Sequence, residues 1–125
     1  MRVKGGYALM DALRLHGVKH IFGYPGGAVL PIYDEIFQQN DIRHVLVRHE
    51  QGAAHMADGY SRVSGRHGVV IGQNGPGISN CVTAIAAAYW AHSPVVVITP
   101  ETGTLTQGLG GFQEAHQLPM FAEFT

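Results

Sequence analysis

The sequence predicts an α/β fold: a doubly wound parallel sheet with helices on both faces. Hydrophobic periodicity alternates along the chain between short apolar runs of strand length and longer segments with helical spacing. Strands that alternate with helices in this way form βαβ units. With 125 residues, of which 46% are hydrophobic and 14% are charged, the chain forms one globular domain at most.

The first half of the chain contains three predicted helices and two predicted strands. Leu9 and Leu13 recur at helical spacing, and Gly17 follows where a helix commonly ends. Pro31 suits the first turn of a helix, and Gly65 stops the last helix of this half. In chain order we expect a helix over 6–16, a strand over 20–23, a helix over 28–38, a strand over 44–48 and a helix over 50–64.

The second half continues the alternation and then loses it. We expect a strand over 69–72, a largely apolar helix over 78–91 and a fully buried strand over 95–99. Beyond Pro100 the sequence becomes a loop rich in glycine and threonine, with no closing helix. This pattern predicts a domain over 1–125 that is truncated at its C-terminus or taken from a longer enzyme.

Composition argues against several classes of partner. The net charge is −1 and the chain has no run of Lys or Arg. It therefore lacks the basic patch by which proteins bind nucleic acid or an anionic membrane. The run Val95–Ile98 is too short to cross a bilayer, and no apolar run follows Arg2 and Lys4 to form a signal peptide. Cys81 stands alone, which excludes an internal disulfide; we expect it on the buried side of a helix, in a cytoplasmic protein.

Four segments follow the predicted strands directly, where open parallel sheets bind ligands. Three of them are rich in glycine, and the other carries an acid. Their convergence predicts the functional site. The segments are 23–27, 49–51, 72–77 and 99–113.

Glu50 is the acid among these segments. Small residues follow it at Gly52, Ala53 and Ala54, which leaves room for a flat ring beside the carboxylate. The alternative is that Glu50 only stabilises the N-terminus of its helix through the helix dipole. The residues alone leave both interpretations open.

The pair His49 and His55 resembles part of a zinc motif, but its spacing does not fit. Ligands four residues apart share a face of a helix, whereas a spacing of six turns the second residue away. We therefore predict no metal site. The segment 72–77 lacks the order of a dinucleotide or Walker motif, so it is either an anion-binding turn, as a flavodoxin-like nucleotide domain would use, or a tight structural turn.

Together the ordered motifs resemble a known family. GYPGG, RHEQGAAHMADGYSR, QNGPG and GGFQE follow one another as in the pyrimidine-binding (PYR) domain of thiamine-diphosphate (ThDP) enzymes of the acetohydroxyacid synthase family. The likeness covers nearly the whole chain. The stretches 21–35 and 47–55 resemble acetolactate synthases, whereas 72–77 and much of the chain after it resemble sulfoacetaldehyde acetyltransferases. Acetolactate synthases usually carry TSGPG where this chain has QNGPG, and the balance favours the acetyltransferase.

The resemblance implies a role for Glu50. In related enzymes the matching glutamate hydrogen-bonds N1′ of the aminopyrimidine ring and favours the tautomer that removes a proton from the thiazolium ring. The resemblance also assigns substrate contacts to Phe112 and Gln113. The implied cofactor-binding residues are Tyr24, Pro25, Gly26, Gly27, Glu50, Gly75 and Gln113.

The resemblance further implies what these residues lack. ThDP enzymes bind Mg²⁺ through a GDG motif in a second, diphosphate-binding (PP) domain, and the one Asp-Gly here, Asp58-Gly59, lies within a predicted helix. The implied partners are the PP domain of a second subunit, in a homodimer or tetramer, and a small keto acid or aldehyde. FAD is compatible with the family but not indicated.

The implied reaction is transfer of a two-carbon acetyl unit. Sulfoacetaldehyde and phosphate would give acetyl phosphate and sulfite. The alternatives are condensation of pyruvate, as in acetolactate synthase, and a non-catalytic PYR-like module for dimerisation.

Overall fold

The computed structural model describes residues 2–125 and confirms the α/β fold class. A parallel four-stranded sheet forms its centre, with the strand order β2-β1-β3-β4. The strands are β1 (His20–Gly23), β2 (Arg43–Leu46), β3 (Gly68–Ile71) and β4 (Val95–Ile98).

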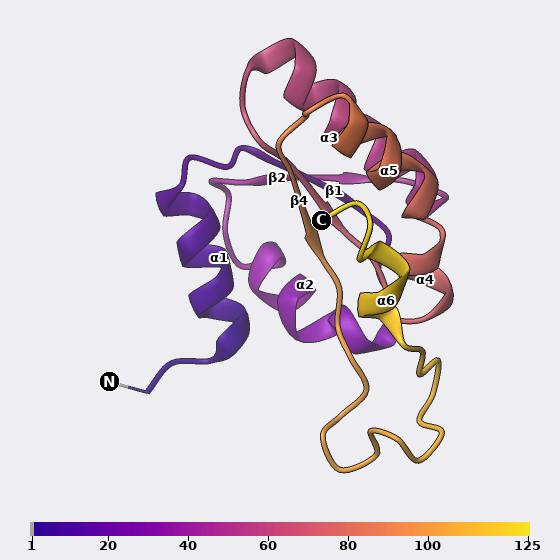
Figure 1. Cartoon of the computed structure of the whole chain (residues 1–125). Helices are drawn as coiled ribbons and strands as arrows, with labels where there is room; N and C mark the ends of the chain where they lie inside the picture. Colours follow the sequence, from indigo (N-terminus) through magenta and orange to yellow (C-terminus); the bar gives the residue numbers. More distant parts are fainter. Residues whose placement is uncertain (1) are drawn as a thin grey trace.

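Helices cover both faces of this sheet, as Figure 1 shows. Helices α1 and α2 lie on one face, and α3 and α5 lie on the other. The helices are α1 (Gly5–Leu15), the 3-10 helix η1 (Gly27–Val29), α2 (Leu30–Phe37), α3 (Glu50–Ser64), α4 (Pro76–Ser79), α5 (Val82–Trp90) and α6 (Gln117–Phe121).

Alternating side chains of the central strands build two hydrophobic cores. Val69 and Ile71 pack among residues of α1 and α2, whereas Val70 packs among residues of α3 and α5. All three are fully buried, and each stabilises the fold by roughly 1.5–3 kcal/mol. Cys81 is buried in the second core as predicted, and burial together with the Glu50 charge raises the pKa of its thiol to about 12.

Helix α3 begins and ends where the sequence predicts. The His49 ring accepts a hydrogen bond from the backbone N–H of Gln51 at 3.2 Å and so caps the N-terminus. Gly65 ends the helix with φ of 67°, a left-handed conformation that favours glycine. Small residues on the buried face bring α3 close to the sheet: a Cβ at Gly68 would lie 2.1 Å from the carbonyl oxygen of Ala57.

Three expectations were wrong. The predicted helix over 78–91 is two helices, because the chain turns at Asn80 and Cys81, where the Cys81 N–H bonds to the Ile78 carbonyl only three residues back. Strand β4 is at the edge of the sheet, which leaves Val96 41% exposed instead of buried. The segment after Pro100 contains α6, which docks Phe121 into the core. Among residues 2–125, no helix has the length and apolar character that crossing a membrane requires.

Candidate functional site

The topology of the sheet places a site between β1 and β3. From β1 the chain adds β2 on one side and then crosses over to add β3 on the other. The carboxyl ends of β1 and β3 therefore flank the switch point at which open parallel sheets bind ligands. The strands approach closely here, since a Cβ at Gly23 would lie 2.3 Å from the Ile71 side chain.

A cavity of about 320 Å³ opens at this switch point. All four predicted segments contribute to its lining: 24–27 from the first, Glu50 from the second, three residues of 72–77, and the last two residues of 99–113. Gly75 is not among the lining residues. The cavity is lined by Tyr24, Pro25, Gly26, Gly27, Glu50, Gln73, Pro76, Gly77, Asn80, Phe112 and Gln113.

Glu50 is the only acid among these lining residues. It is half-buried at the first residue of α3, and its Oε2 accepts a hydrogen bond from Asn80 Nδ2 at 3.0 Å. Its Oε1 lies beside Gly77, where an added Cβ would come within 3.3 Å. The helix terminus stabilises the carboxylate, so the two sequence-based interpretations of Glu50 are compatible: the same position serves the helix and faces the cavity.

Two buried amide side chains, neither of them expected from the sequence, connect the segments of the site, and Gln73 also lines the cavity. Gln73 and Asn74 are 7% and 2% exposed. Gln73 Oε1 accepts from the Ala28 N–H at 3.0 Å, and Gln73 Nε2 donates to Gln113 Oε1 at 3.0 Å. Asn74 Nδ2 donates to the carbonyls of Phe112 and Gln113, each at 3.1 Å. These contacts join the turn after β1, the turn after β3 and the long loop after β4.

Gly75 packs directly against the backbone of Gln113. Its φ of 61° and ψ of −113° suit glycine alone, and an added Cβ would lie 2.2 Å from the Gln113 carbonyl oxygen. Its N–H donates to Gln117 Oε1 at 2.8 Å. That bond, together with the four-residue length of α4, argues against the anion-binding alternative for this turn.

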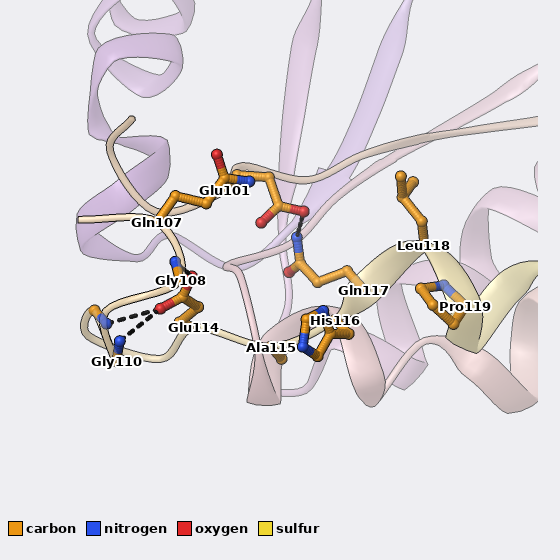
Figure 2. A pocket seen from close by; sticks show the side chains of 11 residues that line it. Glu101, Gln107, Gly108, Gly110, Glu114, Ala115, His116, Gln117, Leu118 and Pro119 are labelled. Carbon is orange, nitrogen blue, oxygen red and sulfur yellow. Dashed lines mark hydrogen bonds between the residues drawn. The ribbon is translucent and has the colours of Figure 1, made fainter. Parts of the chain in front are cut away.

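The base of the long loop is held by two further polar side chains, shown in Figure 2. The Glu114 carboxylate accepts from the backbone N–H groups of Gly108, Gly110 and Gly111, which lowers its pKa. Buried Gln117 donates to Glu101 at 2.8 Å. A cavity of about 450 Å³ lies beside them. The Glu114 carboxylate and the Gln117 amide, which line it, already make hydrogen bonds within the protein, so neither is free to bind a ligand.

Sequence reasoning missed Gln73, Asn74, Asn80 and Gln117. An amide is a weak signal on its own, since most glutamines and asparagines are on the surface. The available signal was position: Gln73 and Asn74 lie two and three residues after the end of the central strand β3, and both are buried.

The histidines do not form a metal site. Within residues 2–125, no three His, Cys, Asp or Glu side chains converge in a way that could hold a metal ion. His49 caps α3, and His55 is exposed on the same helix. Asp58 pairs with Arg62 instead of facing the cavity.

Comparison with known proteins identifies the family of this chain. Residues 3–120 match the family described as thiamine pyrophosphate enzyme, N-terminal TPP binding domain. Similar proteins include the sulfoacetaldehyde acetyltransferases of Alcaligenes xylosoxydans xylosoxydans (69% identical) and Castellaniella defragrans (66% identical), each over 94% of this chain. The acetolactate synthase of Arthrospira platensis is 55% identical over 90% of the chain.

The matches cover 19%, 20% and 20% of those relatives, so the chain spans about a fifth of their length. Both enzyme groups expected from the sequence are present, and the two acetyltransferases are the more similar of the three. The chain therefore belongs to the thiamine pyrophosphate enzymes, as their N-terminal TPP-binding domain.

Proposed function

We propose that this chain is the PYR domain of a longer enzyme that transfers a two-carbon acetyl unit, and that Glu50 is its catalytic residue. The observation that carries the proposal is the position of the Glu50 carboxylate in the switch-point cavity, facing three glycine-bearing turns. The two acetyltransferase relatives favour sulfoacetaldehyde with phosphate as the substrates. The acetolactate synthase relative makes pyruvate the alternative.

The residues of the cavity fit the pyrimidine end of thiamine diphosphate. A carboxylate is an acceptor for a protonated ring nitrogen, and Pro25, Gly27 and Gly77 leave a wall without bulky polar groups. Tyr24 and Phe112 are exposed at the rim, where aromatic rings could contact a flat ligand. When bound, the cofactor supplies the carbanion chemistry.

Glu50 would act at ring atom N1′. Asn80 holds Oε2, which leaves Oε1 beside Gly77 to share a proton with that nitrogen. The geometry favours this assignment because Asn80 fixes the rotation of the carboxylate, and a fixed carboxylate loses less entropy when the ligand binds.

The diphosphate end of the cofactor finds no counterpart in this cavity. No Lys or Arg is among the lining residues, and residues 2–125 contain no group of three His, Cys, Asp or Glu side chains placed to hold a metal ion. We propose that a PP domain of a second subunit supplies both. Tyr89, 45% exposed, and Trp90, 74% exposed, form a T-shaped pair at the end of α5, and these aromatic rings favour a protein partner. The single reduced cysteine is consistent with a cytoplasmic location.

The test is Glu50→Gln in the full-length enzyme, assayed with sulfoacetaldehyde plus phosphate and separately with pyruvate. Glutamine keeps the size of the side chain but cannot share a proton with the ring nitrogen. We expect turnover to fall by about 100-fold or more, the usual effect of removing an acid–base group. The preferred substrate of the unmodified enzyme decides between acetyltransferase and acetolactate synthase.

Glu123→Gln is the matched control, because Glu123 is exposed and does not line the cavity. It should leave turnover unchanged. Full activity in Glu50→Gln would remove the proposed role, and an unmodified enzyme inactive on both substrates would favour the non-catalytic alternative.

A further inference from the structure

Three segments of the site meet at one pair of buried amides. Gln73 bonds to the Ala28 N–H and to the Gln113 side chain, and Asn74 bonds to the Phe112 and Gln113 carbonyls. The two amides also bond to each other. We call Gln73 and Asn74 the amide clamp. It is the only described side-chain hydrogen-bonding connection between the β1 and β3 turns and Phe112 or Gln113.

The glycines of the site leave room for the clamp. An added Cβ at Gly26 would lie 2.4 Å from Gln73 Oε1, and one at Gly77 would lie 2.8 Å from Gln73 Cβ. The Cβ at Gly75 would collide with the Gln113 carbonyl. The space that a Cβ at Gly26 would occupy is thus filled by Gln73, while Gly26 itself still lines the cavity.

The clamp holds a strained residue. Gln113 has φ of 57°, in the left-handed region that residues other than glycine rarely adopt. Backbone strain of this kind persists where surrounding bonds enforce it and is concentrated at functional sites. Two hydrogen bonds enforce the conformation of Gln113. The Gln73 side chain donates to Oε1 of Gln113, and the Asn74 side chain donates to the Gln113 carbonyl.

The strained backbone determines where Phe112 lies. Phe112 is 82% exposed at the rim of the cavity, although it is a large apolar side chain. Its carbonyl is bound to Asn74, so the clamp fixes the backbone from which the ring projects. The Glu50 side chain accepts its hydrogen bond from Asn80 and is not bonded to the clamp.

We propose that Gln73 and Asn74 are positioning residues that hold Phe112 and Gln113 over the cavity and thereby set the affinity for the substrate. The inference rests on the proposed function of the cavity, but it concerns a different property. Glu50 shares a proton with the ring nitrogen, whereas the clamp determines the positions of Phe112 and Gln113, against which the substrate would bind.

The first measurement is hydrogen–deuterium exchange of the full-length enzyme, which needs no turnover. In Gln73→Met the side chain keeps its length but loses all three of its hydrogen bonds, to Ala28, Asn74 and Gln113. We expect faster exchange in the segment around Phe112 and Gln113, with the rest of the sheet unchanged. Gln39→Met is the matched control. Gln39 makes three similar bonds to Ile36 and Ile42 at the other end of the sheet, so its loss should not affect the loop.

The second measurement separates KM from kcat, with sulfoacetaldehyde or pyruvate, whichever the enzyme uses. We expect KM to rise about 5- to 10-fold in Gln73→Met, corresponding to one net hydrogen bond, with kcat and thiamine-diphosphate affinity nearly unchanged. Gln113→Ala removes the same contact from the half-exposed loop and guards against misfolding of the buried variant. The double variant should be no worse than either single one, because both break one linkage.

The outcomes distinguish this inference from the proposed function. Unchanged exchange around Phe112 in Gln73→Met overturns the clamp, whatever Glu50→Gln shows. Faster exchange with kcat falling and KM constant overturns the role in substrate affinity. Activity surviving in Glu50→Gln overturns the proposed function alone, because the exchange measurement still reports on the clamp.

Discussion

The two ends of the sheet carry cavities of different size and different construction. The amino end has the larger, about 580 Å³, lined among others by His16, Lys19, Arg66 and His67. The carboxyl end has the smaller, about 320 Å³, around Glu50. At the amino end, among residues 2–125, the side chains of those four residues make no hydrogen bond or ion pair; the one bond that joins any of them to a side chain is that of the Arg66 backbone N–H, which donates to the Ser64 hydroxyl at 3.2 Å. At the carboxyl end, buried amides join three segments.

Helix ends explain the amino-end cavity without a ligand. Helices α1 and α3 both end there, and each is followed by a glycine with positive φ, Gly17 after α1 and Gly65 after α3. The C-termini of helices carry partial negative charge, which basic side chains complement. The comparison teaches that neither the volume of a cavity nor its charge locates the site in this fold. The candidate site is marked instead by the convergence of the turns after β1 and β3 on one acid, Glu50.

The strongest test of this contrast substitutes one glycine at each end. Gly75→Ala should destabilise the domain by about 3 kcal/mol, because the Cβ meets the Gln113 carbonyl and the backbone conformation suits glycine alone. Gly17→Ala should cost only about 1 kcal/mol, since φ is positive but nothing lies within 4 Å of the new Cβ. Urea unfolding of both variants gives the free energies. Equal losses would mean that the carboxyl end is no more tightly packed than the amino end.

The sequence predicts individual helices and strands better than the hydrogen bonds that connect them. Helix α3 was predicted at its correct bounds, Glu50–Ser64, because a local signal marks its end at Gly65. Strand β1 was also predicted correctly, since an apolar run enters a glycine turn. These features depend on neighbours in the chain.

The features that the sequence did not predict depend on contacts between residues distant in the sequence. Gln73 and Gln113 are 40 positions apart, and no local pattern announces their bond. The turn at Asn80 and Cys81 is hidden in an apolar helical sequence, and both residues bond to Glu50, 30 and 31 positions earlier. Glu50 itself was predictable because parallel strands bring their carboxyl ends to one edge, a rule of topology that needs no knowledge of contacts.

A smaller effect should come from the ion pair that holds the middle of α3. Asp58 is buried and bonds twice to Arg62, at 2.9 and 2.8 Å. Asp58→Asn should lower the free energy of unfolding by about 2 kcal/mol, the range for a hydrogen bond between charged groups. Asp11→Asn, which breaks the more exposed pair with Arg14, should change it by less than about 1 kcal/mol.

The same pair predicts an acid limit of stability. The hydrogen bonds from Arg62 lower the pKa of Asp58 below its ordinary 3.8. Its contribution is complete above that value and is lost as the pH falls through the lowered pKa, because the unfolded chain binds the proton first. Unfolding curves of the Asn variant should therefore converge with those of the unmodified domain below about pH 3.8. A constant difference at all pH values would assign the loss to packing.

The smallest effect is expected at His44 on β2, whose ring is 3.0 Å from the Tyr33 hydroxyl. Burial lowers the pKa of His44 below its ordinary 6.5. The ring therefore binds a proton more weakly in the folded domain than in the unfolded chain. Stability should fall as the pH drops below about 6.5 and level off once the folded ring also titrates. In His44→Gln this slope should flatten, whereas Tyr33→Phe keeps the ring buried and should keep the slope. If stability instead rose on acidification in the unmodified domain, the half-buried ring would be binding its proton more tightly than the unfolded chain does, and simple burial would not describe this part of the sheet.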